Sequence, residues 1–153
     1  EDDIHQCLQG LEAELVCLAG FMRILTAGFV ARWHDRLINV HPSLLPAYRG
    51  LDTHARVLAD GARFTGCTVH FVRAEMDAGP IIVRAAVPVH PGDDAERLAQ
   101  RVLAAEHRIY PLALRLIAAG RVSVRDEVVS IDGASVPETA LFNPADDTDG
   151  GDE

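Results

Sequence analysis

The sequence has few cysteines, and no two of them have the spacing of a disulfide or metal-binding motif. Cys7, Cys17 and Cys67 are the only three, and they lie far apart in the chain. An odd, scattered set argues against a disulfide framework and against a zinc site. We therefore expect each thiol to be a small buried side chain and the protein to work in a reducing cytoplasm. HExxH sequences, paired acids at ligand spacing and Cys/His clusters are also absent, so we predict no bound metal.

Long hydrophobic segments and an excess of basic residues are missing as well. No apolar run approaches the roughly 18 residues needed to span a bilayer. The first residues are acidic, unlike the basic start of a secretory signal. The chain has 14 basic and 23 acidic residues and a formal net charge of −9. Because binding to nucleic acid phosphates needs a basic face, we expect neither a nucleic acid nor a membrane partner.

Short apolar runs alternate with helix-like segments, and 48% of the residues are hydrophobic. Runs at residues 15–19 and 37–40 are typical of strands buried on both faces. Residues 67–72 and 80–89 read as strands that could pair antiparallel, followed by short strands at 122–124 and 128–131. Helices are expected at 4–12, in part of 21–33, at 53–59 and at 93–119, where Pro111 should kink or split the last one.

This alternation predicts an α/β fold with a mainly parallel, twisted sheet flanked by helices. We expect one catalytic domain over residues 1–143. Residues 144–153 are rich in Asp and Gly and should form a disordered acidic tail. In parallel sheets of this kind, ligands bind beyond the carboxyl ends of the strands.

Asn39 and His41 lie at such a strand end, on the same side of an extended segment, because side chains alternate with period two. An amide donor and an imidazole could converge there on an oxyanion forming at a carbonyl carbon. The alternative is an Asn that caps a turn and a His that fills space. Asp77 precedes Ala-Gly, which is common turn chemistry, but its carboxylate could also pair with a histidine. We expect His70 to be buried and structural, and His54 to lie on a helix surface or a mobile loop.

Five blocks, in order and at matching spacing over about residues 4–124, resemble the phosphoribosylglycinamide formyltransferases. The blocks are LAGFMRIL at 18–25, NVHPSLLP at 39–46, GLDTH at 50–54, TVHFV at 68–72 and MDAGPII at 76–82. The resemblance implies a Rossmann-like formyltransferase fold and transfer of a formyl group in purine (IMP) biosynthesis. The donor would be 10-formyltetrahydrofolate, and the acceptor the amine of glycinamide ribonucleotide.

The same resemblance implies roles for single residues. The catalytic trio falls on Asn39, His41 and Asp77, and contacts to the glycinamide ribonucleotide fall on Pro42 and Glu106. The residues implied to bind the reduced folate are Met22, Arg23, Ile24, Leu25, Val30, Asn39, Glu75, Met76, Asp77, Ala78 and Gly79.

One departure from the family is the missing Gly-Asn/Ser-rich loop, which holds the substrate phosphate through backbone N–H groups. We therefore expect an N-terminally truncated catalytic portion that binds folate weakly and has little transferase activity on its own. Three alternatives stay open. They are formyltetrahydrofolate deformylase, which uses the same trio with water as acceptor, methionyl-tRNA formyltransferase, and a non-catalytic folate-binding remnant. The oligomeric state is not predicted.

Overall fold

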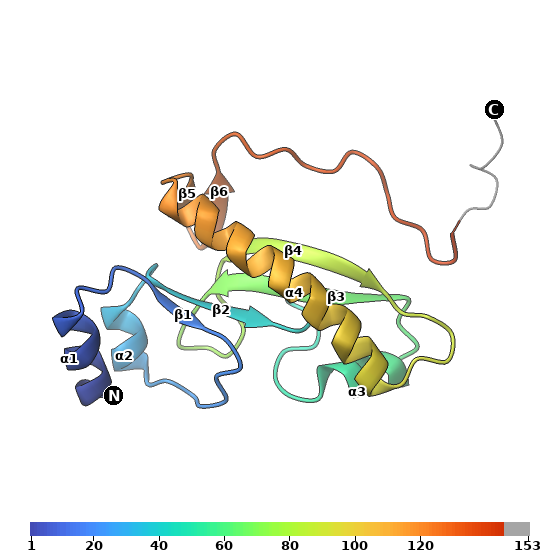
Figure 1. Cartoon of the computed structure of the whole chain (residues 1–153), viewed down its shortest axis with the longest axis horizontal. Helices are drawn as coiled ribbons and strands as arrows, with labels where there is room; N and C mark the ends of the chain where they lie inside the picture. Colours follow the sequence, from blue (N-terminus) through green and yellow to red (C-terminus); the bar gives the residue numbers. More distant parts are fainter. Residues whose placement is uncertain (146–153) are drawn as a thin grey trace.

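A four-stranded sheet in the order β1-β2-β3-β4 is the centre of the computed structural model, which describes residues 1–145 (Figure 1). The strands are β1 (Val16–Leu18), β2 (Leu37–His41), β3 (Phe64–Phe71) and β4 (Ile81–Pro88). The predicted α/β fold with a helix-flanked sheet is confirmed. The antiparallel pairing expected for β3 and β4 is confirmed. The expectation of mainly parallel pairing is wrong for these strands, because β2–β3 is antiparallel as well and only β1 and β2 are parallel. The loop at 72–80 is too short for the crossover that a parallel β3–β4 pair would need.

Four helices surround this sheet: α1 (Asp2–Gly10), α2 (Ala27–Arg32), α3 (Thr53–Ala59) and α4 (Ala95–Ala118). Figure 1 shows α1 and α2 side by side beyond β1, and α4 running diagonally across one face of the sheet. An ion pair of 2.7 Å between Asp2 and Arg32 joins α1 to α2. Within the predicted segment 21–33, only α2 is helical, so residues 19–26 remain irregular.

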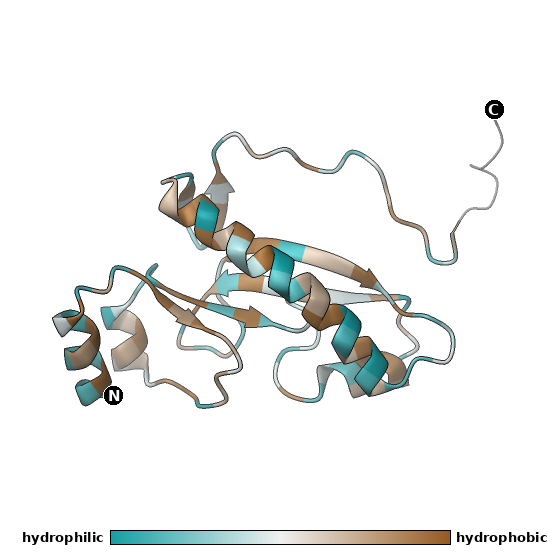
Figure 2. Ribbon diagram, viewed as in Figure 1, coloured by the Kyte–Doolittle hydropathy of each residue, from teal (hydrophilic) through white to brown (hydrophobic). Residues whose placement is uncertain are grey.

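Helix α4 holds the sheet through one apolar stripe, as its sequence periodicity predicts. Leu98, Val102, Ile109 and Ala113 are buried, and apolar and polar residues alternate along the helix in Figure 2. Pro111 lies inside the helix without splitting it, contrary to one of the two expected outcomes. The proline removes a single backbone donor, and buried residues on both sides of it keep the two halves packed on the sheet.

A separate two-stranded hairpin follows α4 and is built from β5 (Val122–Arg125) and β6 (Val128–Ile131). Its turn residues Asp126 and Glu127 have φ of 50° and 59°, the positive values that a type I′ hairpin turn requires at both central positions. Val122, Val124 and Val129 pack against the main core. The hairpin is therefore fixed to the body of the protein, and its turn projects from a supported base.

The cysteine prediction is only partly correct. Cys67 is buried, and burial raises the pKa of its thiol to about 12. Cys7 and Cys17 are exposed, because they lie on α1 and on the edge strand β1, which are only partly covered. Most of the predicted tail at 144–153 lies outside the described residues, so that domain boundary stays a prediction. Within residues 1–145, no helix is long and apolar enough to cross a membrane.

Gly66→Ala should destabilise the protein strongly. A Cβ at this position in β3 would lie 1.9 Å from the carbonyl oxygen of Ala85 and 2.8 Å from the Leu44 side chain. Relieving such a clash requires the β3 and β4 backbones to move apart, at an expected cost of about 1–3 kcal/mol. Urea unfolding measures this change. Gly10→Ala is the matched control, since a Cβ there meets nothing within 4 Å, and equal stability of the two variants would contradict the packing argument.

Candidate active site

A cavity of about 530 Å³ lies beyond the carboxyl ends of the parallel pair β1 and β2. Its wall is formed by residues 20–25, the end of β2, residues 50–54, the β3–β4 loop and one residue of α4. This size is within the range of small-molecule sites. The position agrees with the expectation that ligands bind where parallel strands end.

His41 is the last residue of β2 and reaches the cavity from its floor. Its side chain is only 8% exposed, and its Nδ1 lies 3.4 Å from the Oδ2 atom of Asp77. The other ring nitrogen, Nε2, lies 2.9 Å from the backbone carbonyl oxygen of Tyr48. Both ring nitrogens thus face oxygen acceptors. An imidazole ring that carries a proton on each nitrogen can donate a hydrogen bond to both of them.

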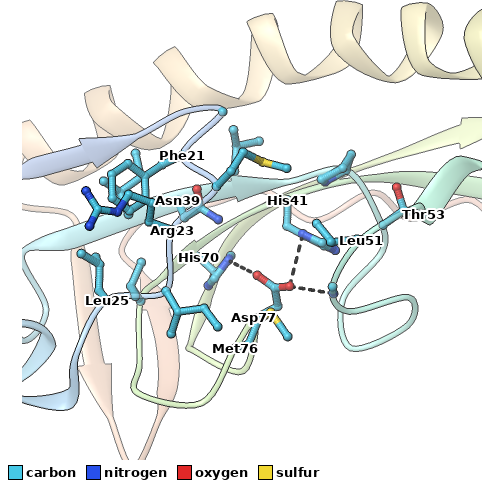
Figure 3. A pocket seen from close by; sticks show the side chains of 18 of the residues that line it. Phe21, Arg23, Leu25, Asn39, His41, Leu51, Thr53, His70, Met76 and Asp77 are labelled. Carbon is cyan, nitrogen blue, oxygen red and sulfur yellow. Dashed lines mark hydrogen bonds and ion pairs between the residues drawn. The ribbon is translucent and has the colours of Figure 1, made fainter.

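Asp77 connects three parts of the site, as the dashed lines in Figure 3 show. Oδ2 faces His41 and also accepts a hydrogen bond of 2.9 Å from the backbone N–H of Gly50. Oδ1 lies 3.9 Å from the Nε2 atom of His70. The residue adopts φ of 51°, a left-handed conformation that aspartate tolerates better than most residues. The tight turn predicted at this position therefore aims the carboxylate at the cavity.

Asn39 lies two residues before His41 on β2, and both side chains line the cavity. Figure 3 shows Asn39 and His41 as side chains of the same strand among the residues that line the pocket. Val40, which lies between them, also lines the cavity, so the period-two argument stays a prediction. An amide, an imidazole and a carboxylate thus line one cavity, and such groups can stabilise an oxyanion and move a proton.

Comparison with known proteins identifies the family. Residues 1–114 match the formyl transferase family. The chain is 40% identical over 143 residues to the phosphoribosylglycinamide formyltransferase of Haemophilus influenzae, and the match covers 94% of this chain and 68% of that protein. The chain belongs to the phosphoribosylglycinamide formyltransferase family.

Other relatives of this formyltransferase chain include both larger proteins and solved structures. It is 53% identical over 121 residues to the trifunctional purine biosynthetic protein adenosine-3 of Gallus gallus, covering 79% of this chain but only 12% of that protein. The crystal structure of phosphoribosylglycinamide formyltransferase from Anaplasma phagocytophilum superposes with a TM-score of 0.85 at 46% identity, covering 88% of this chain and 67% of that one. A formyltetrahydrofolate deformylase from Pseudomonas syringae reaches a TM-score of 0.81 at 28% identity, covering 85% and 44%.

Most of the site residues predicted for this formyltransferase lie on the cavity wall. Besides the trio, the wall includes Met22, Arg23, Ile24, Leu25, Val30, Pro42, Met76 and Glu106. The wall does not include Glu75, Ala78 and Gly79. Glu75 points outward, 73% exposed, and pairs with Arg49 at 2.7 Å, and Gly79 is packed against the carbonyl of Phe71. These three residues belong to the loop that supports Asp77.

Two histidines that the sequence did not assign to the site also line the cavity. His54 was expected on a helix surface or mobile loop, but it lies half-buried in the first turn of α3, and burial lowers its pKa. His70 is buried as predicted, its pKa is lowered by burial, and its Nδ1 lies 2.9 Å from the carbonyl oxygen of Phe71. His70 pairs in register with Asn39 across β2 and β3, and this pairing, which the sequence does not report, brings it to the cavity.

Glu106→Gln should make the protein more stable at neutral pH. Burial raises the pKa of Glu106 above its ordinary value of 4.5, so the folded state binds protons more tightly than the unfolded state. Its contribution to stability is therefore greatest below pH 4.5 and is lost as pH rises through the folded-state pKa. The amide carries no charge, and we expect a gain on the order of 0.5 kcal/mol at pH 7 that disappears near pH 4. Thermal unfolding at both pH values measures it, and a gain that persisted at pH 4 would contradict a charge effect.

No group of three or more His, Cys, Asp or Glu side chains within residues 1–145 is arranged to hold a metal ion.

Proposed function

We propose that this chain transfers a formyl group from 10-formyltetrahydrofolate to the amine of glycinamide ribonucleotide, a step of de novo purine biosynthesis. The observation that carries this proposal is the His41–Asp77 pair, 3.4 Å apart beside Asn39 in the cavity of a formyltransferase-family chain. We also propose that the chain acts in the cytoplasm, where a reducing environment suits its three free cysteines.

In this mechanism the substrate amine attacks the formyl carbon, and a tetrahedral intermediate with a negative oxygen forms. The Asn39 amide and a protonated His41 donate hydrogen bonds to that oxygen. Both groups come from one short strand, so their backbone positions are held by the sheet. Losing one such donor typically costs about 10²–10³ in rate.

Collapse of the intermediate breaks the bond between the formyl carbon and the folate nitrogen. His41 donates a proton to that leaving nitrogen, a contribution of general acid catalysis worth about 10²–10⁴ in rate. In the free protein, Nε2 of His41 faces the Tyr48 carbonyl and Nδ1 faces Asp77. Proton donation therefore requires His41 to exchange one of these acceptors for an atom of the substrate.

Asp77 holds the imidazole by its second nitrogen and offsets the positive charge on the ring. The amine loses a proton as its new bond to the formyl carbon forms, and a water molecule bound to Asp77 is the proposed carrier. Glu106, together with Pro42, is proposed to contact the ribonucleotide and to orient its amine. The reaction then consists of one bond formed and one broken, with protons exchanged at both nitrogens.

The folate is proposed to bind along the more apolar side of the cavity. Leu25, Val30 and Val72 line this side, and Val30 is buried at its base. Apolar contacts of this kind, with a few polar groups at fixed positions, are typical of cofactor and substrate pockets. Both partners in this proposal are small molecules, a reduced folate and glycinamide ribonucleotide.

Formyltetrahydrofolate deformylase is the competing proposal. It is supported by the structural similarity to the Pseudomonas syringae deformylase, and it differs only in using water as the acceptor. At the place where deformylases have a sequence similar to HHSFLP, this chain has His41-Pro-Ser-Leu-Leu-Pro46. This difference favours transfer to the amine.

The deciding experiment incubates the protein with 10-formyltetrahydrofolate, with and without glycinamide ribonucleotide. It uses residues 1–153 alone and a chimera that joins them to the N-terminal region of the Haemophilus influenzae relative. Formylated ribonucleotide, detected by mass spectrometry, supports the proposed function. Formate released in the absence of the amine supports the deformylase. Folate binding without either product, in both proteins, supports a non-catalytic remnant and contradicts both enzymatic proposals.

A further inference from the structure

Arg73, just before the loop residues that carry Asp77, is held by two carboxylates from distant parts of the chain. Its side chain is 13% exposed; Nη2 lies 2.6 Å from Asp35 Oδ1, and Nε lies 2.6 Å from Glu127 Oε2. Burial alone would lower the pKa of the guanidinium, but hydrogen bonds to Glu127 and Asp35 outweigh it and raise the pKa. Such charge-assisted, forked contacts are among the stronger and more directional hydrogen bonds in proteins.

Both carboxylates belong to turns that neighbouring core residues support, although their side chains are 38% and 59% exposed. Asp35 lies in the turn just before β2, next to the buried residue Leu37. Glu127 lies in the turn of the β5–β6 hairpin, whose valines pack on the main core. Arg73 therefore joins the start of the β3–β4 loop to two supported positions outside that loop.

The loop is also narrow at the position of Arg73. The backbone N–H of Phe71 donates to the carbonyl of Pro80 at 2.9 Å, which closes the base of the loop. A Cβ on Gly79 would lie 1.7 Å from the carbonyl oxygen of Phe71 and 3.3 Å from Cγ of Arg73. The aliphatic part of the Arg73 side chain thus lies against Gly79, near the end of the loop. The position of Arg73 therefore affects both the start and the end of the loop.

In its middle part, the loop is held by weaker contacts. The Arg49–Glu75 pair is well exposed, at 39% and 73%, and exposed ion pairs contribute little to stability. The hydrogen bond from Gly50 to Asp77 comes from another irregular segment. The ion pairs of Arg73 with Asp35 and Glu127 are less exposed to solvent than the Arg49–Glu75 pair.

We propose that Arg73 is a positioning residue for Asp77, and that the Arg73–Glu127 pair makes the β5–β6 hairpin part of the support of the active site. Removing the guanidinium leaves Asp35 and Glu127 facing each other without a cation between them, and it frees the start of the loop. A shift of about 1 Å in a catalytic group can cost on the order of 10² in rate. The effect on rate rests on the proposed function, whereas the effect on the loop does not.

The test compares Arg73→Met and Glu127→Gln with Arg101→Met as the matched control. Arg101 makes a two-pronged pair with Asp93 at the start of α4, outside the cavity. We expect Arg73→Met to lower kcat about tenfold to a hundredfold and Glu127→Gln to lower it about threefold, with little change in KM for the ribonucleotide. Arg73→Lys should not restore kcat, because an ammonium cannot reproduce the guanidinium fork. Arg101→Met should lower the melting temperature without lowering kcat.

Hydrogen exchange of the backbone amides at residues 73–79 provides a readout that needs no substrate. Exchange should accelerate in Arg73→Met and Glu127→Gln, stay unchanged in Arg101→Met, and be no faster in the Arg73/Glu127 double variant than in Arg73→Met. Unchanged exchange in Arg73→Met overturns the proposal, as does faster exchange with an unchanged kcat. A wild-type protein without formyl transfer overturns the proposed function alone, and the exchange data still decide whether Arg73 holds the loop.

Discussion

In the chimera that restores the N-terminal region, His41→Ala is expected to abolish formyl transfer while leaving folate binding nearly intact. The substitution removes a hydrogen-bond donor to the developing oxyanion and the proton donor for the leaving nitrogen at once. Each role alone is worth about 10²-fold or more, so kcat should fall by at least about 10³-fold. The apolar wall of the cavity, which includes Leu25 and Val30, is untouched. Turnover is followed by mass spectrometry, and folate affinity by calorimetry.

His90→Ala is the matched control for this variant, since His90 is exposed and does not line the cavity. It should retain both activity and folate affinity. A loss of folate affinity as large as the loss of rate in His41→Ala would mean that His41 serves binding rather than chemistry. Thermal unfolding of both variants detects any loss of rate that merely reflects a damaged fold.

Asp77→Asn should lower kcat by about 10²-fold or more, with a smaller effect on folate affinity. The carboxylate offers two oxygen acceptors, which face His41, His70 and the Gly50 amide. The substituted amide offers one acceptor and adds two donors, so at least one of these contacts is lost, together with the negative charge that stabilises an imidazolium. Steady-state kinetics on the variant and the wild type give the change in kcat and KM separately.

A surface control separates this effect from a general change in charge. Glu96→Gln removes one negative charge from the exposed first turn of α4 and should leave kcat unchanged. If Asp77→Asn keeps the wild-type rate, the ion pair with His41 has no part in catalysis, and the proposed role of Asp77 is wrong.

Local features of the fold could be predicted because they depend on residues close together in the sequence. The apolar run at 15–19 predicted β1. The three- and four-residue spacing of Leu98, Val102, Ala105, Ile109, Leu112 and Leu116 predicted α4, although Leu112 is exposed and Ala113 is buried in its place. The pairing pattern of the sheet was harder, because continuous apolar runs are compatible with parallel and antiparallel neighbours alike. The antiparallel direction of β3–β4 could be expected from the short connection between these strands, but no sequence pattern reports the antiparallel direction of β2–β3. The unsplit passage of α4 through Pro111 depends on packing against the sheet.

Some features of the candidate site could likewise be predicted from the sequence, and others could not. Asn39 and His41 could be placed together at the end of one strand. The contact between His41 and Asp77 joins the end of β2 to the β3–β4 loop. It could not be obtained from spacing, so it depended on the family resemblance. His54 was misassigned because its orientation in the cavity follows from where α3 begins, after an Asp52 with φ of 55°. No periodicity in the sequence reports that angle.

The methionine side chains at the cavity can serve as NMR probes of ligand binding. The chain has two methionines, and both line this one cavity, with Met22 77% exposed and Met76 55% exposed. They come from two separate irregular segments, one after β1 and one in the β3–β4 loop. A protein enriched with carbon-13 at its methionine methyl groups would therefore give two resonances, each reporting on a different wall. A folate entering between these walls should shift both signals, whereas a molecule bound on the outer face of α4 should shift neither.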